Sequence, residues 1–217
     1  MKKFKQLIKN TITISAFLLI SFFESSFSHA SEITDGVKKT IDSIIEVVSK
    51  EEFKSDDKKT ERQELIRKIV EKKFSYPEMS RRSLAKHWKE RTPEEKNEFT
   101  SLFGRLLESS YARKIEGYTD EKIIYIDEKV KGNVALVKTI IQKSNDEIPV
   151  DYKLTRVGND WKIYDFIVEG VSMIKNYRTQ FRKIIRKTSY QELVKKLKAK
   201  VENINNDKDV KSDSLSS

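Results

Sequence analysis

The sequence predicts an α+β fold, in which helices wrap one side of a curved, four-stranded antiparallel sheet. Two changes of hydrophobic period predict this. Apolar residues recur at helical spacing up to about residue 117, and between Tyr118 and Glu169 the period changes to two. Helical spacing returns after Gly170. Because there is neither a linker nor an internal repeat, we expect one domain over residues 31–204.

Six helices are expected from the apolar stripes. They begin near Ile33, Leu65, Pro77, Thr92, Met173 and Ser189. Residues 51–60 form a charged connector between the first two. The clearest start is Thr92-Pro93-Glu94-Glu95, which combines an N-cap, a proline at the first helical position and a glutamate three residues after the cap.

Four strands are expected between the helices, at 121–129, 133–143, 147–157 and 160–168. Short polar or glycine-containing turns separate them, such as Lys131-Gly132-Asn133 and Gly158-Asn159. In the third strand Val150, Tyr152 and Leu154 share one face. Connections this short imply an antiparallel meander, with one face toward the helices and the other toward water.

Residues 1–30 have the pattern of a secretory signal peptide. Basic residues precede an apolar segment from Ile12 to Phe23, and a short polar stretch ends at Ser28-His29-Ala30. This apolar segment is too short to cross roughly 30 Å of hydrocarbon. We expect cleavage after Ala30, with an uncleaved anchor helix as the alternative. At the other end, residues 205–217 are polar and expected to be disordered.

The charge pattern bears on binding partners. The formal net charge is +10, which is compatible with anionic lipid or nucleic acid as a partner. However, acids are interleaved with bases, as at Glu64 and Lys68 or Glu192 and Lys196. This pattern is typical of solvated helix faces and argues against a basic groove for nucleic acid.

Few residues of the expected mature chain can support catalysis. It contains one histidine, His87, and the whole chain lacks cysteine, which excludes a His/Cys metal cluster. Asp165, beside Tyr164, is the one candidate for an acid or base in an apolar pocket. We favour a structural role in which Asp165 bonds backbone or a basic neighbour. A small-molecule isomerase or hydrolase stays open as the alternative function.

One segment is specific to a known family. Residues Trp161 to Phe181 read WKIYDFIVEGVSMIKNYRTQF. This closely resembles the W-x-x-Y-D-x-x-x-E-G-V-S-[LM]-[VI]-x-N-Y-R-x-Q-F signature of the MlaC family, also called toluene-tolerance or auxiliary transport proteins. The similarity extends over roughly residues 33–203, with further matches at Trp88, Phe99, Phe103 and Tyr111. One departure is the turn at Lys187-Thr188, where family members often carry glycine.

The resemblance implies a non-enzymatic carrier without a cofactor, in the periplasm of a Gram-negative bacterium. Family members bind phospholipids and shuttle them between an outer-membrane lipoprotein–porin complex and an inner-membrane ABC transporter with a substrate-binding hexamer. They thereby maintain the lipid asymmetry of the outer membrane. They are similar in fold to NTF2-like domains and hold acyl chains between sheet and helices. We expect a monomer that does not bind nucleic acid.

Strand alternation and helical stripes then predict the lipid-binding residues. In the last strand we choose the face of Tyr164 over that of Ile163 and Ile167. The predicted set is Val137, Thr139, Ile141, Val150, Tyr152, Leu154, Tyr164, Phe166 and Val168 from the strands, Val171, Met173, Ile174, Tyr177 and Phe181 after them, and Phe103, Leu107 and Tyr111 from the long helix.

Overall fold

The computed structural model describes residues 31–117, 121–143 and 146–205. The predicted signal peptide lies outside these residues. So does the expected polar tail, apart from Asn205, which ends the last helix. None of the helices in the described ranges has the length and apolar character needed to cross a bilayer.

The described residues confirm the predicted α+β class and the order of its elements. The helices are α2 (Glu32–Ser49), α3 (Lys59–Lys73), α4 (Tyr76–Leu84), α5 (Pro93–Glu116), α6 (Met173–Lys187) and α7 (Tyr190–Asn205). The charged connector forms two short 3-10 turns, η1 (Glu51–Phe53) and η2 (Asp56–Lys58). A third, η3 (Ala85–Trp88), follows α4.

The sheet is an antiparallel meander in which every strand pairs with the next. Its strands are β1 (Lys122–Lys131), β2 (Val134–Lys143), β3 (Asp146–Val157), β4 (Asp160–Val168) and β5 (Val171–Ser172). We predicted four strands, so β5 is an addition. Glu169 and Gly170 connect it to β4 with φ angles of 49° and 80°. This left-handed backbone costs Gly170 little, but it is uncommon for a residue such as Glu169. A two-residue strand is too short to show alternation in the sequence.

Local capping explains where several helices begin. Thr92 and Glu95 form a reciprocal capping box. The Glu95 backbone N–H donates to Thr92 Oγ1 at 3.2 Å, and the Thr92 N–H donates to a Glu95 carboxylate oxygen at 3.0 Å. At the start of α7, Ser189 Oγ accepts from the Glu192 N–H at 3.1 Å. These bonds satisfy backbone donors that the first helical turn leaves unpaired.

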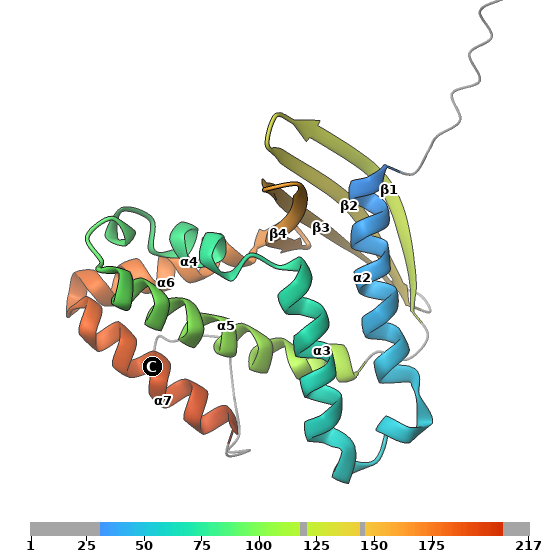
Figure 1. The fold of residues 1–217 in the computed structure, drawn as a ribbon, viewed down its shortest axis with the longest axis horizontal. Helices are drawn as coiled ribbons and strands as arrows, with labels where there is room; N and C mark the ends of the chain where they lie inside the picture. Colours follow the sequence, from blue (N-terminus) through green and yellow to red (C-terminus); the bar gives the residue numbers. More distant parts are fainter. Residues whose placement is uncertain (1–30, 118–120, 144–145, 206–217) are drawn as a thin grey trace, which may run out of the picture. The chain divides into compact units, whose positions relative to one another are not determined.

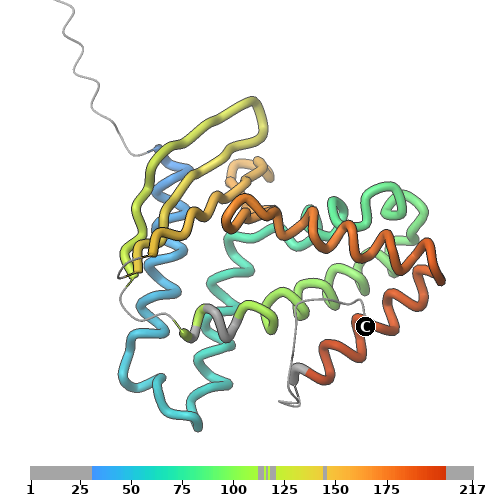
Figure 2. The backbone as a smooth tube through the Cα atoms, turned by 180° about the vertical axis from the view of Figure 1, so that it is seen from behind, coloured from blue at the N-terminus to red at the C-terminus, as the bar shows by residue number. Residues whose placement is uncertain are grey.

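One hydrophobic core, called here the helical core, is formed by buried residues of α4, α5, α6 and α7 together with Tyr164 of β4. Its centre is a cluster of aromatic rings from α5, α6 and the start of α7. Their centroids lie 5.1 to 6.3 Å apart, several in edge-to-face contact. The rings belong to Phe99, Phe103, Tyr177, Phe181 and Tyr190. Figure 2 shows α6 and α7 lying alongside α5.

A second cluster, called here the sheet core, lies where the first half of α2 covers the sheet (Figure 1). Val37, Val137 and Leu154 are fully buried in it. A polar contact fixes the same end of the helix, because the Thr34 N–H and hydroxyl both donate to one Glu128 carboxylate oxygen, at 3.0 and 2.6 Å. The chain is therefore closely packed in the helical core and in the sheet core. Between these two cores, the second half of α2 does not cover the face of the sheet.

Candidate functional site

A cavity of about 1410 Å³ lies between the two cores. The second half of α2, all of α3 and the C-terminal part of α5 form one side. The inner face of β1–β4 forms the other. This volume exceeds the roughly 300–1,000 Å³ typical of pockets for small molecules.

The apolar part of the wall comes from both sides. Its side chains are Ile41, Ile44, Ile45, Val48, Ile66, Val70, Phe74, Met79, Leu107, Tyr111, Ile115, Ile123, Ile141, Ile148, Val150, Tyr152, Ile163, Phe166, Val168, Val171 and Met173.

The α2 side chains in this wall are only partly covered by protein. Ile41, Ile44, Ile45 and Val48 are all only half-buried, although they face inward. Leaving apolar area in water is unfavourable by about 25 cal/mol per Å². A ligand that covers these side chains would recover that free energy, so the wall favours an apolar ligand.

The cavity meets the sheet core at one end. Ile163 is buried at 1 % exposure and belongs both to the cavity wall and to the sheet core. Phe74 and Tyr152 also line the cavity here and pack against that core. Burial raises the pKa of Tyr152 to about 12. Its phenol is therefore neutral at physiological pH, and this end of the cavity carries no charge from it.

Charged residues line other parts of the cavity. Glu121 and Lys143 lie beside each other where β1 begins and β2 ends, and their charged groups approach to 2.8 Å. Glu64 and Arg67 form an ion pair along α3. Lys59, at the start of α3, is part of the same wall. The wall can thus contact apolar groups and the polar or charged groups of one ligand.

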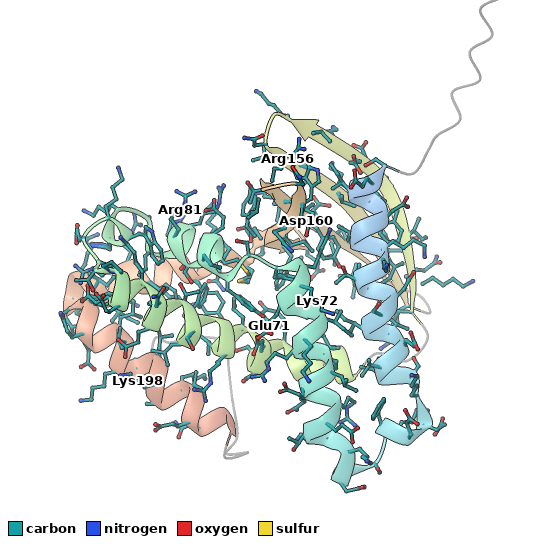
Figure 3. All side chains as sticks on the ribbon, viewed as in Figure 1. Glu71, Lys72, Arg81, Arg156, Asp160 and Lys198 are labelled. Carbon is teal, nitrogen blue, oxygen red and sulfur yellow. The ribbon has the colours of Figure 1, made fainter. Side chains whose placement is uncertain are left out.

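A polar pair is built into the helical side of the wall. The Tyr76 hydroxyl donates to a Glu108 carboxylate oxygen at 2.8 Å. Burial raises the pKa of Glu108, and the nearby charge of Glu71 adds to the shift. Figure 3 shows Glu71 on α3, on the side facing α5. Burial and the Glu108 charge likewise raise the pKa of Tyr76, so Tyr76 acts as a donor throughout the physiological range.

Comparison with protein families identifies the group to which this fold belongs. The family model described as "MlaC protein" matches residues 38–199, well over half of the chain. The chain belongs to the MlaC protein family. The match confirms the resemblance seen in the segment from Trp161 to Phe181.

Two curated members of this group are similar in sequence. The intermembrane phospholipid transport system binding protein MlaC of Haemophilus influenzae is 30% identical over 120 residues, covering 52% of this chain and 56% of that protein. Toluene tolerance protein ttg2D of Pseudomonas putida is 31% identical over 98 residues, covering 44% and 46%. The matched part thus spans about half the length of these relatives.

A solved structure has the same fold. It is a phospholipid-binding protein from Ralstonia solanacearum, determined in complex with a phospholipid. The TM-score is 0.72 at 17% sequence identity, and the match covers 81% of this chain and 99% of the other. At this identity the likeness shows a shared fold, and it includes nearly all of the Ralstonia chain.

The structure brings part of the predicted lipid-binding set together in the cavity wall of this MlaC-family chain. These residues are Leu107, Tyr111, Ile141, Val150, Tyr152, Phe166, Val168, Val171 and Met173. They come from six elements, and they share the wall with the α2 and α3 side chains. Their contact with lipid stays a prediction.

The other predicted residues lie outside the wall, which corrects our placement of them. They are Phe103, Val137, Thr139, Leu154, Tyr164, Ile174, Tyr177 and Phe181.

Burial in the two cores explains this correction. Phe103, Ile174, Tyr177 and Phe181 are packed inside the helical core. Val137 and Leu154 lie in the sheet core. Thr139 is buried within the sheet, where its hydroxyl donates to the Val150 carbonyl at 2.7 Å. Each therefore already has the protein neighbours that a ligand would otherwise supply.

A bulge explains why Tyr164 leaves the cavity and Ile163 enters it. Lys153 pairs with Asp165, but the next residue, Leu154, pairs with Ile163. The extra residue in β4 reverses the alternation of its side chains. Tyr164 therefore packs against the helical core, with the Arg82 guanidinium 3.8 Å from its ring centroid. Simple alternation, which selected Tyr164 over Ile163, fails at this point.

Sequence reasoning missed the whole contribution of α2 and α3. Ile41, Ile44 and Val48 belong to the apolar stripe that predicts the helix beginning near Ile33. Val70 and Phe74 belong to the stripe that predicts the next helix, near Leu65. No signal in one sequence separates a stripe that packs against protein from one that faces a cavity, because both have the same period.

The candidate catalytic residues have other roles. Asp165 Oδ1 accepts from the Ile174 N–H at 3.0 Å and Oδ2 accepts from Ser172 Oγ at 2.7 Å, so this carboxylate caps α6. Lys153 lies 3.9 Å away, which agrees with the structural role that we favoured. His87 lies outside the cavity wall, with Nδ1 3.4 Å from a Glu90 oxygen. Among the described residues, no cluster of three potential metal ligands occurs.

Proposed function

We propose that this chain is a carrier that binds single phospholipids in the cavity and transports them between membranes. The observation that carries the proposal is a cavity of about 1410 Å³ with half-buried apolar walls on two sides. A methylene group fills about the same volume as a water molecule in the liquid, roughly 30 Å³. The cavity thus has room for roughly 45 such groups, enough for two acyl chains and part of a headgroup.

The free energy of exposed acyl chains explains why a carrier is needed. Two chains contain on the order of 30 methylenes, and each is unfavourable in water by about 0.8 kcal/mol. A lipid crossing an aqueous compartment alone would face a barrier of roughly 20 kcal/mol or more. A cavity that covers both chains removes most of this barrier. A charged headgroup that stays hydrated avoids its own desolvation cost.

Two membrane complexes would exchange lipid with this carrier, and both are proposed from the family. One is an outer-membrane lipoprotein–porin complex, and the other is an inner-membrane ABC transporter with a substrate-binding hexamer. The Haemophilus relative, named a binding protein of an intermembrane phospholipid transport system, supports this proposal. The consequence for the cell would be the maintenance of outer-membrane lipid asymmetry.

The periplasm is the compartment that suits this role. The pattern of residues 1–30, with basic residues before an apolar segment and Ala30 at the cleavage position, supports export. Intact-mass measurement of the protein recovered from the periplasm tests this directly. A chain beginning at Ser31 is expected, and a chain recovered with its N-terminal segment in the membrane fraction would contradict it.

Native mass spectrometry of the protein purified without detergent tests the carrier function. We expect a species heavier by one phospholipid, which is released on denaturation and identified in an organic extract. Liposomes supply the control, since delipidated protein should regain the same mass from them. Protein that purifies without lipid and takes up none from liposomes would refute the proposal.

A further inference from the structure

The charges on α6 are segregated, unlike those on the other helices. Between Met173 and Lys187 the helix carries six basic residues and no acidic one. We call them the α6 basic face. They are Lys175, Arg178, Arg182, Lys183, Arg186 and Lys187.

The basic face occupies most of the outward half of the helix, beside Asn176 and Thr179. All six side chains are exposed. Lys175, Arg178, Arg182 and Arg186 follow one another at spacings of three and four, and the other two adjoin them. The opposite half of α6 is buried in the helical core. With a rise of 1.5 Å per residue, the face from Lys175 to Lys187 is about 18 Å long, and Figure 2 shows α6 unobstructed from behind.

The basic face has no acidic partner within the part of the chain that the structure describes. On other helices, several cations are paired with an acid. Lys38 pairs with Asp42 at 2.8 Å and Lys198 pairs with Glu98 at 2.7 Å. The interleaving of acids and bases that we expected from the sequence therefore holds on α2 and α3 and fails on α6.

We propose that the α6 basic face is a docking surface for an anionic phospholipid bilayer. Clusters of four to eight Lys and Arg residues attract anionic membranes by about 1 kcal/mol per residue near the surface. Arg182, Lys183, Arg186 and Lys187 are exposed within two turns of α6. Lipid phosphates approaching this end of the helix would meet four cations.

The composition of the face favours a membrane over a protein or a nucleic acid. The cores of protein interfaces are enriched in aromatic residues, methionine and arginine and depleted in lysine. Three of the six cations on α6 are lysines, and its exposed side has no aromatic ring or methionine. The exposed side of α6 offers only basic side chains with Asn176 and Thr179. It also has no exposed aromatic ring on which a nucleic-acid base could stack. A bilayer requires only a field of positive charge.

The position of α6 connects this surface to the cavity. Met173 and Asn176, in the first turn of α6, line the cavity wall. Val171, immediately before the helix, also lines it and is 63% exposed. A bilayer held along α6 would therefore lie next to the rim of the cavity. This consequence rests on the proposed carrier function, whereas membrane binding itself does not.

Co-sedimentation with vesicles tests the docking surface. Vesicles of phosphatidylcholine alone are compared with vesicles of equal parts phosphatidylcholine and phosphatidylglycerol. The test variant combines Arg182→Gln, Lys183→Gln and Arg186→Gln. At about fivefold per cation, we expect roughly 100-fold weaker binding to the anionic vesicles. Binding of the unaltered protein should disappear near 1 M salt, where the Debye length is about 3 Å.

A matched control variant distinguishes the effect of losing the α6 basic face from the effect of lowering the net charge. Lys38→Gln, Lys50→Gln and Lys198→Gln remove the same charge from cations that are paired with acids. Figure 3 shows Lys198 projecting outward from α7. We expect this variant to lose less than about tenfold. Equal losses in the two variants, or no binding of the unaltered protein to anionic vesicles, would overturn the proposal.

Two further measurements distinguish the remaining outcomes. Duplex DNA bound as tightly as the anionic vesicles, with the same loss in the α6 variant, would overturn the choice of a membrane as the partner. Native mass spectrometry of every variant reports the phospholipid carried in the cavity. Vesicle binding by a protein that never carries lipid would support the docking surface while refuting the carrier function.

Discussion

The substitution Ile141→Glu tests the cavity as the lipid site. Ile141 lies on the inner face of β2, lines the cavity and is half-buried. In the lipid-free protein the new carboxylate meets the cavity, so we expect a loss of less than about 1.5 kcal/mol in the free energy of unfolding. With lipid bound, the carboxylate keeps its hydration and excludes acyl groups. Displacing about four methylenes costs about 3 kcal/mol, or roughly 100-fold in affinity.

The adjacent residue provides a matched control. Ile140 is also half-buried, but it points to the opposite face of β2, where it pairs with Ile124 and Pro149. Ile140→Glu introduces the same charge outside the cavity and should leave lipid affinity within about threefold of the original. Affinity is measured by titration with a fluorescent phospholipid, and folding by circular dichroism and urea denaturation. The reasoning is refuted if Ile141→Glu binds lipid normally, or if both variants lose it equally.

Substitutions at three further positions test the stability of the fold, at Glu108 in the cavity wall, at Asp165 and at Ala85. Burial raises the pKa of Glu108 in the folded protein, so its ionisation destabilises the fold as pH rises from the unfolded pKa of about 4.3 through the folded pKa. Glu108→Gln should therefore be more stable than the original at pH 7 and no more stable below about pH 4. Urea denaturation across this pH range measures the difference in stability between the two proteins, and a difference that did not change with pH would contradict the argument. Asp165→Ala removes the α6 cap and leaves the buried Ile174 N–H unpaired, for an expected loss of about 3 kcal/mol. Asp165→Asn, whose amide oxygen can still accept, should lose clearly less in the same assay, and equal losses would contradict the cap. Ala85 is exposed and has φ 51° and ψ −119°, a backbone conformation that is strained for alanine. Ala85→Gly should therefore raise the free energy of unfolding by about 1 kcal/mol. A lower melting temperature of this variant would contradict the assignment of strain to Ala85.

Local rules explain why so much of the fold could be predicted from the sequence. Thr92 and Glu95 cap α5 through contacts within one turn, and such contacts depend on neighbours in the sequence. The turns of the meander use glycine where the backbone is left-handed, as at Gly132 and Gly158. Each of these features is decided by a few adjacent residues, so one sequence is enough to predict it.

The cavity wall could be predicted only in part because it depends on distant contacts. Whether Phe103 or Leu107 faces the cavity depends on which side α6 and α7 cover, and both residues belong to the same apolar stripe of α5. The β4 bulge at Tyr164 arises from the register with β3. A bulge changes the face of every residue beyond it, so alternation counted from one end of a strand gives the wrong face at the other.

The residues that stabilise the fold differ in burial from the residues that line the cavity. Phe99, Phe103 and Phe181 have no exposed surface and form a core that needs no ligand. Ile44 and Ile141, on opposite sides of the cavity, are equally apolar but only half-buried. Protein interiors are normally close-packed, and departures from consistent packing are expected at functional sites. A ligand that binds only the folded state stabilises it in proportion to the logarithm of its concentration. The helical core therefore supplies stability without lipid, while the open walls leave their apolar surface available for a lipid to cover.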